Sequence, residues 1–202
     1  RSLTIKTESS EKTYDGIALT NNGWSILSGA LFSTHRVEFT MEASIINAGE
    51  INNTIGITIY DEENNDVTRY YDITYDIGLL SVSKRALAVS TGSAEKFYNG
   101  TALINDTWNI ESGSVLTSQT FTHVMNSTIT EPGTIANTIG VTILDENDID
   151  MSINYNITYD LGELSVLPRE LTVKTESSIK KYDGITLTND AWSIQTGTLF
   201  ST

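Results

Sequence analysis

Two acidic segments carry the side chains best suited to bind a metal ion, and they lie at a fixed spacing. One begins at Asp61 and the other at Asp145, so they are 84 residues apart (145 − 61). Calcium prefers such carboxylate and amide oxygens, although the glycine of an EF-hand loop is missing here. The segments therefore indicate either a weak calcium site or a plain acidic hairpin loop, and the loop is favoured. The calcium candidates are Asp61, Glu63, Asp66, Asp145, Asn147 and Asp150.

The two histidines, His35 and His123, do not share this spacing, because 123 − 35 = 88. A catalytic or metal-binding arrangement built on histidine would therefore differ between the two copies of a duplicated unit. Solvated or packing roles are expected for both residues. We predict that the chain is not an enzyme, that no residue is catalytic and that, calcium apart, it binds no cofactor.

A lysine does recur at the fixed spacing, as Lys12, Lys96 and Lys180, and Asn53 recurs as Asn137. Some surface modules without cysteine lock themselves with a bond between a lysine and an asparagine, which releases ammonia. Each lysine here precedes a turn, and lysine at such a position is usually solvated. The solvated interpretation is favoured over the cross-link.

The spacing of 84 residues extends through the whole chain. Similar stretches begin at Arg1, Arg85 and Arg169. A fixed period of this length indicates a tandem array. We predict a first module at 1–84, a second at 85–168 and a truncated third at 169–202. Because the chain opens on Arg1 and stops inside the third unit, which is too short for its own core, we expect it to be part of a longer protein.

Alternating apolar residues predict short strands in every module. Leu3 and Ile5 open the first module, Trp24 and Ile26 follow, and Leu80 belongs to the closing strand. We expect about seven strands in a module, buried on one face and separated by turns, with no helical period. These patterns predict an all-β fold: tandem small β-sandwich (immunoglobulin-like) or β-grasp-like modules joined end to end. Because the junctions hold no Gly/Ser run, neighbouring modules should be held rigidly.

Recurring tyrosines leave two interpretations open. Tyr71 and Tyr75 return as Tyr155 and Tyr159. Aromatic rings in such a row could form a platform on which sugars stack. Their alternation by two residues fits packing in the core better, so the core interpretation is favoured.

Charge and composition exclude several classes of partner. The net charge is −14 and the isoelectric point is about 4.3, so phosphate backbones and anionic lipids are repelled. We therefore expect no nucleic-acid partner, and we expect no membrane insertion because no apolar run has the necessary length. The chain has no cysteine, so it carries neither a disulfide framework nor a thiolate metal site.

Two motifs together resemble a known family. The motif Lys-x-Tyr-Asp/Asn-Gly ends at Gly16, Gly100 and Gly184, and the second motif reads Tyr-Asn-Ile-Thr-Tyr-x-x-Gly-x-Leu-x-Val from Tyr155. This combination resembles the Tyr-Asp-Gly-type repeats, also called YDG or MBG domains, of prokaryotic cell-surface adhesin-like proteins. Asn99 replaces the aspartate in the second copy, which keeps the turn chemistry intact. The resemblance implies a secreted or wall-anchored extracellular protein and no enzymatic activity.

Three functional hypotheses follow. The leading one is a structural stalk or spacer of a prokaryotic extracellular surface protein, which projects a distal domain or builds a fibre, with neighbouring copies of the module as partners. The first alternative is an adhesive or glycan-binding module that recognises a host or cell-surface protein or glycan, with specificity in the diverged segments 33–40 and 117–124. The second is a subunit of a self-assembling extracellular filament or surface layer, since an incomplete third unit is compatible with strand exchange.

Overall fold

The computed structural model describes residues 1–199 and confirms the all-β fold. Strands hold 49% of the chain and helical residues 3%. The last three residues of the predicted third module, 200–202, lie outside the described residues. Within 1–199 no helix is long and apolar enough to cross a membrane.

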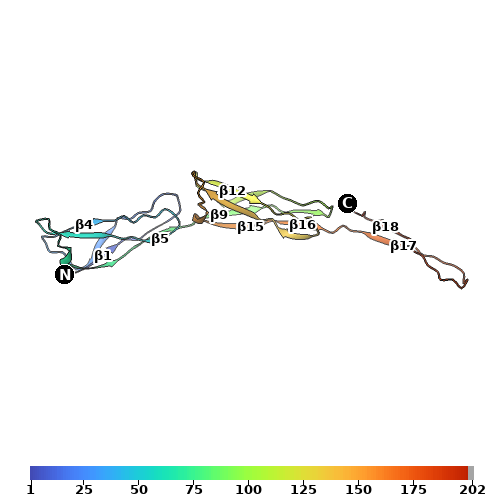
Figure 1. The fold of residues 1–202 in the computed structure, drawn as a ribbon, viewed down its shortest axis with the longest axis horizontal. Helices are drawn as coiled ribbons and strands as arrows, with labels where there is room; N and C mark the ends of the chain where they lie inside the picture. The colour runs from blue at the N-terminus through green and yellow to red at the C-terminus, as the bar shows by residue number, and fades with distance from the viewer. Residues whose placement is uncertain (200–202) are drawn as a thin grey trace. The chain divides into compact units, whose positions relative to one another are not determined.

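The first repeat contains eight strands and one short 3-10 helix (Figure 1). This is one strand more than the alternation of apolar residues predicted. The additional strand is β5, which the alternation missed because β5 is short and exposed apart from Ile51. The elements are β1 (Ser2–Thr7), β2 (Ser10–Thr13), β3 (Trp24–Ser28), β4 (Arg36–Thr40), β5 (Gly49–Asn52), β6 (Gly56–Tyr60), η1 (Thr68–Tyr70), β7 (Asp72–Asp76) and β8 (Leu79–Ser83).

The second repeat has the same element order, and the third contributes two strands among the residues described. The second comprises β9 (Arg85–Thr91), β10 (Ala94–Phe97), β11 (Trp108–Gly113), β12 (Thr120–Met125), β13 (Gly133–Ala136), β14 (Ile139–Leu144), η2 (Ser152–Asn154), β15 (Tyr155–Asp160) and β16 (Glu163–Leu167). The third comprises β17 (Thr172–Thr175) and β18 (Trp192–Thr196).

Each complete repeat is closed by pairing its first strands with its last strands. In the first repeat β1 lies between β3 and β7, β8 lies between β2 and β5, and β4 pairs with β6. The β1–β7 and β2–β8 pairs are parallel, whereas the others are antiparallel. The second repeat has the matching orders β11-β9-β15, β10-β16-β13 and β12-β14. The first strands of a repeat therefore need its last strands as hydrogen-bonding partners, and the reverse. The finer choice between an immunoglobulin-like and a β-grasp-like module stays a prediction.

The predicted inward faces of the first repeat form its core. Leu3, Ile5, Ile59 and Leu80 are at most 1% exposed. Leu3 and Ile59 share one apolar cluster with Tyr71, which follows η1. Burying each such side chain contributes about 1.5–3 kcal/mol, so these alternating positions account for much of the stability of the repeat.

The chain divides into two compact units. Unit 1 is Arg1–Ala88 with Ile110–Thr122 and Val141–Thr158, and unit 2 is Val89–Asn109 with His123–Gly140 and Tyr159–Thr202. The division passes through the second repeat rather than along the arginine boundaries. The module boundaries at 84/85 and 168/169 thus describe the sequence period, and independent folding of each module stays a prediction.

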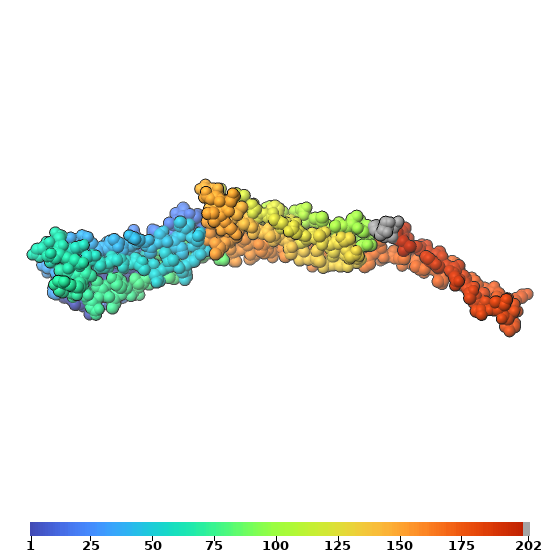
Figure 2. Space-filling model, in the orientation of Figure 1, coloured from blue at the N-terminus to red at the C-terminus, as the bar shows by residue number. Residues whose placement is uncertain are grey.

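The third repeat departs from the predicted burial. Its β17–β18 hairpin is paired, but Val173 is 54% and Trp192 61% exposed, and the hairpin with its loop forms a narrow ribbon (Figure 2). The prediction of a core-facing tryptophan strand is wrong for Trp192, because no second layer covers it within residues 1–199. Its counterparts Trp24 and Trp108 are half-buried, and Trp24 packs against Phe39 at 5.1 Å between ring centroids.

Candidate functional site

The acidic loops are tight turns whose first aspartate binds the backbone. Asp61 Oδ1 accepts the N–H groups of Glu63 at 3.0 Å and of Asn65 at 2.8 Å. Asp145 Oδ1 does the same for residues 147 and 149, both at 2.9 Å. Asn64 and Asp148 adopt the left-handed conformation at φ 63° and 61°, which asparagine and aspartate tolerate better than most residues.

The last aspartate of each loop precedes a 3-10 helix and also binds the backbone. Asp66 Oδ1 accepts the N–H of Thr68 at 2.9 Å, and Asp150 Oδ1 accepts that of Ser152 at 2.8 Å. Hydrogen bonds from those residues, first of all from their side chains, lower the pKa of both carboxyls. The pKa of Asp61 is lowered as well, chiefly by the Asn65 side chain.

These hydrogen bonds give the acidic residues a role in shaping turns. Among residues 1–199 no group of three or more histidine, aspartate or glutamate side chains is close enough to hold a metal ion. Calcium binding by the six candidate residues stays a prediction, and a rise in melting temperature on calcium addition would test it.

The recurring lysine closes the Tyr-Asp-Gly turn. Lys12 Nζ donates to Asp15 Oδ1 at 2.6 Å and also to the Ile17 carbonyl, while Asp15 accepts the Ile17 N–H at 2.9 Å. Lys96 Nζ binds Asn99 Oδ1 at 2.9 Å in the second repeat. The side-chain bond from Lys12 is the main cause that lowers the pKa of Asp15.

The recurring asparagine joins two loops elsewhere in the repeat. Asn53 Nδ2 donates to the carbonyls of Glu8 at 2.8 Å and Asn21 at 2.9 Å. Asn137 donates in the same way to the carbonyls at positions 92 and 105. In each copy the lysine and the asparagine thus bind different groups, and both have structural partners.

A packed contact joins the first repeat to the second, and we call it the first junction. It consists of Tyr14 from the first repeat and Leu116, Gln119 and Tyr155 from the second, all within unit 1. Gln119 Nε2 donates to Tyr14 Oη at 2.7 Å, and Tyr155 Oη donates to Gln119 Oε1 at 2.6 Å. Tyr155 Oη also accepts the N–H of Leu116 at 3.1 Å.

The first junction excludes water from both rings. Tyr14 is 1% and Tyr155 3% exposed, and their rings meet edge to face at 5.8 Å between centroids. Burial is the main cause that raises the pKa of Tyr155. Such a ring pair contributes about 0.5–1.5 kcal/mol beyond its buried area. Alongside it, Asn154 Oδ1 accepts the N–H of Ala48 at 2.7 Å.

In each complete repeat a residue of the diverged segment contacts the tyrosine that follows the 3-10 helix. His35 corresponds to Gln119, since 35 + 84 = 119, and its Nδ1 lies 2.8 Å from Tyr71 Oη. Tyr71 Oη also accepts the N–H of Phe32 at 3.1 Å, as Tyr155 does from Leu116. The expected packing role of His35 is confirmed, because its ring contacts those of Phe32 and Tyr71.

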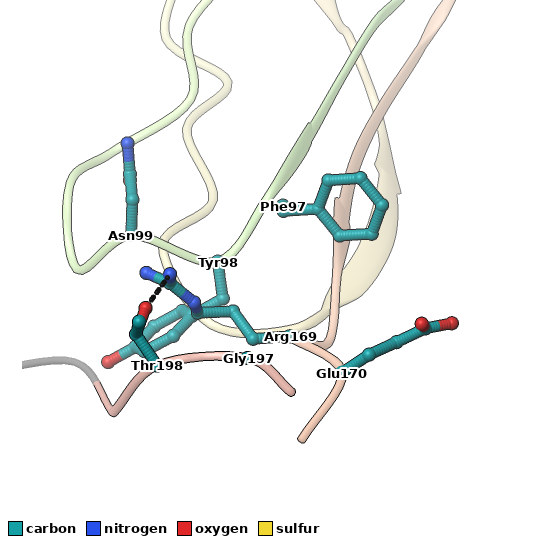
Figure 3. A pocket seen from close by; sticks show the side chains of 7 residues that line it. All are labelled: Phe97, Tyr98, Asn99, Arg169, Glu170, Gly197 and Thr198. Carbon is teal, nitrogen blue, oxygen red and sulfur yellow. Dashed lines mark hydrogen bonds between the residues drawn. The ribbon is translucent and has the colours of Figure 1, made fainter. Parts of the chain in front are cut away.

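The corresponding place between the second and third repeats is a pocket of about 520 Å³, which we call the second junction pocket. Figure 3 shows Phe97, Tyr98 and Arg169 gathered around it, with the Arg169 guanidinium donating to Thr198 Oγ1 at 2.8 Å. Arg85 makes the equivalent bonds to Ser114 at 2.8 and 2.9 Å. The pocket is further lined by Asn99, Glu170 and Gly197.

The tyrosine row is divided between core and surface. Tyr71 and Tyr155 are 7% and 3% exposed, which confirms the core interpretation for them. Tyr75 and Tyr159 are each 46% exposed, so that interpretation is wrong for them. Tyr75 belongs to β7, an edge strand of its sheet, and one side of an edge residue faces solvent.

Comparison with protein-family models, with curated proteins and with solved structures found no match to this chain.

Proposed function

We propose that these repeats are structural spacers of a prokaryotic extracellular surface protein, arranged as a stalk that projects a distal domain or builds a fibre. The resemblance to Tyr-Asp-Gly-type repeats suggests the surface location. A chain that carries a net charge of −14 also stays soluble and avoids non-specific contact with anionic cell surfaces.

The first junction is the observation that carries this proposal. A spacer must hold one module against the next, and a flexible linker would not do so. Here β8 ends at Ser83 and β9 begins at Arg85, so a single residue separates the two strands. Tyr14, Gln119 and Tyr155 then bury a hydrogen-bonded aromatic contact beside that connection. The short connection and the buried contact together oppose bending between the first repeat and the second.

Small-angle X-ray scattering of the full chain tests the proposal. A compact domain of 202 residues would have a radius of gyration of about 17 Å. A spacer should give a value well above this, with a distance distribution skewed towards long distances. A value close to 17 Å would refute the spacer role. The variant Gln119→Leu should lower the stiffness of the particle without unfolding the repeats.

A further inference from the structure

The chain contains two Asn-Gly sequences, Asn22-Gly23 and Asn99-Gly100. An asparagine followed by glycine can lose its side-chain amide without an enzyme, because the unhindered glycine nitrogen attacks the side-chain carbon and expels ammonia. The reaction is helped by a free glycine N–H and by donors that stabilise the negative charge developing on the amide oxygen. The two sequences differ in both respects.

At Asn99 three donors converge on the amide oxygen. Lys96 Nζ donates to Asn99 Oδ1 at 2.9 Å, and Thr101 donates its N–H at 3.1 Å and its hydroxyl at 2.8 Å. The Thr101 hydroxyl in turn accepts a hydrogen bond from Lys96 Nζ at 2.9 Å. A cation and two further donors on one amide oxygen polarise the amide and stabilise an oxyanion at the same atom.

The same position holds an anion in the other two repeats. Asp15 accepts a hydrogen bond from Lys12 Nζ at 2.6 Å, and Asp183 is paired with Lys180 at 2.8 Å. The hydrogen bond from the lysine is the largest cause that lowers the pKa of both carboxyls. The turn therefore favours a negative charge at this position, and in the second repeat an uncharged amide occupies it.

The backbone places the attacking nitrogen beside the Asn99 amide. Because Asn99 Oδ1 accepts the N–H of Thr101, the side chain folds back over the intervening peptide, whose nitrogen belongs to Gly100. Within residues 1–199 the Gly100 N–H has no hydrogen-bond acceptor, so its nitrogen is free to attack. Asn99 and Gly100 are exposed, and their counterparts Asp15 and Gly16 are exposed too, although Gly16 lies beside the second repeat.

The sequence Asn22-Gly23 lacks both features. The Gly23 N–H donates to Asn21 Oδ1 at 2.8 Å, so this nitrogen is already engaged. In the part of the chain that the structure describes, no donor binds the Asn22 amide oxygen. Asn22 is exposed as Asn99 is, so it provides a control with the same dipeptide in the same chain.

We propose that Asn99 is a self-modification site, at which the turn of the second repeat promotes the deamidation of Asn99 to aspartate. The Gly100 nitrogen bonds to Asn99 Cγ and loses its proton, the Cγ–Nδ2 bond breaks, and Nδ2 leaves with that proton as ammonia. Water then opens the cyclic succinimide and supplies the oxygen that replaces the lost nitrogen.

The same donors decide how water opens the ring. They polarise the Cγ carbonyl and so direct water to Cγ rather than to the backbone carbonyl carbon. The product is therefore aspartate with a normal backbone, not isoaspartate. This aspartate pairs with Lys96 as Asp15 pairs with Lys12, so the second repeat gains the ion pair that the first already has. The reaction occurs once in each chain and does not depend on a spacer role.

Peptide mass spectrometry of the full chain, incubated at mildly alkaline pH and sampled over time, measures the deamidation of both asparagines. In the folded chain Asn99 should react at least tenfold faster than Asn22, because only Asn99 has donors on its oxygen. In urea the two rates should become similar, since the hydrogen bonds are absent and both asparagines precede glycine. The share of aspartate relative to isoaspartate at position 99 should be higher in the folded chain than in urea.

Two chain variants locate the cause. Lys96→Met keeps a long side chain but removes its charge, so the rate at Asn99 should fall at least tenfold. Lys12→Met makes the same change in the first repeat and should alter the rate at Asn99 less than twofold. Circular dichroism checks that both variants keep the β fold, and if Lys96→Met does not fold, the comparison of folded with unfolded chain decides alone.

Three results would overturn the proposal. The first is a rate at Asn99 that is no higher in the folded chain than in urea. The second is a folded Lys96→Met variant that deamidates as fast as the unaltered chain. The third is isoaspartate as the main product in the folded chain, since the donors would then not act on the Cγ carbonyl.

Discussion

Replacing Gln119 by leucine removes the central side chain of the first junction while keeping a similar volume. Two hydrogen bonds are lost, one to Tyr14 at 2.7 Å and one from Tyr155 at 2.6 Å. A hydrogen bond between uncharged groups contributes about 1 kcal/mol net, so Gln119→Leu should cost about 2 kcal/mol. Unit 1 has about 120 residues, for which 1 kcal/mol shifts the melting temperature by about 4 °C, so a decrease of roughly 8 °C is expected.

Calorimetry of the full chain measures this shift, with Gln195→Leu on exposed β18 as the matched control. A double-mutant cycle with Tyr14→Phe should return a coupling energy of about 1 kcal/mol, because both changes remove the same hydrogen bond. A decrease below about 2 °C, or an equal decrease for Gln195→Leu, would refute the view that the first junction stabilises unit 1.

Three further perturbations test the repeat itself. Gly113→Ala should lower the free energy of unfolding in urea by at least about 2 kcal/mol, because the φ of Gly113 is +80° and an added Cβ would lie 2.3 Å from the carbonyl oxygen of Ala86. The control Gly184→Ala should lower it less, because Gly184 has a similar φ of +79° but open space around an added Cβ. The pKa of Asp61 is lowered from 3.8 in the folded chain, so the ionised Asp61 stabilises the fold above pH 3.8, and this contribution is lost as the pH falls through the lower folded pKa. Asp61→Asn should therefore remove this part of the pH dependence of the urea midpoint. Asn137→Ala should lower the free energy of unfolding by about 2 kcal/mol, because the carbonyls of Gly92 and Asn105 lose their donor. The control Asn126→Ala, at an exposed position, should change it little, and equal effects of the two variants would contradict the bridging role of Asn137.

The alternation of apolar residues was sufficient to predict the all-β fold and much of the core. Leu3 and Ile5 are buried as their period of two indicates. The same period failed at Val173, because alternation reports which face a strand would bury and not whether a covering strand is present. Strand β5 was missed because a short, mostly exposed strand carries little apolar signal.

The first junction could not be found from residue types alone. Tyr14 belongs to a turn motif, which by itself does not indicate burial, and Gln119 lies in a segment that diverges between repeats. The useful signal was the period itself, since Gln119 and His35 occupy equivalent positions and each binds the tyrosine that follows the 3-10 helix. A polar contact can thus keep its geometry while its residue type changes, which sequence alternation does not reveal.

The distance between a strand of the first repeat and a strand of the second, both within unit 1, tests the central claim most directly. The chain has no cysteine, so Glu11→Cys on β2 and Asn156→Cys on β15, both exposed, provide unique sites for spin labels. Pulsed electron spin resonance should return one narrow distance distribution that broadens when Gln119→Leu is added. A broad distribution in the chain with intact Gln119 would contradict a packed junction between successive repeats.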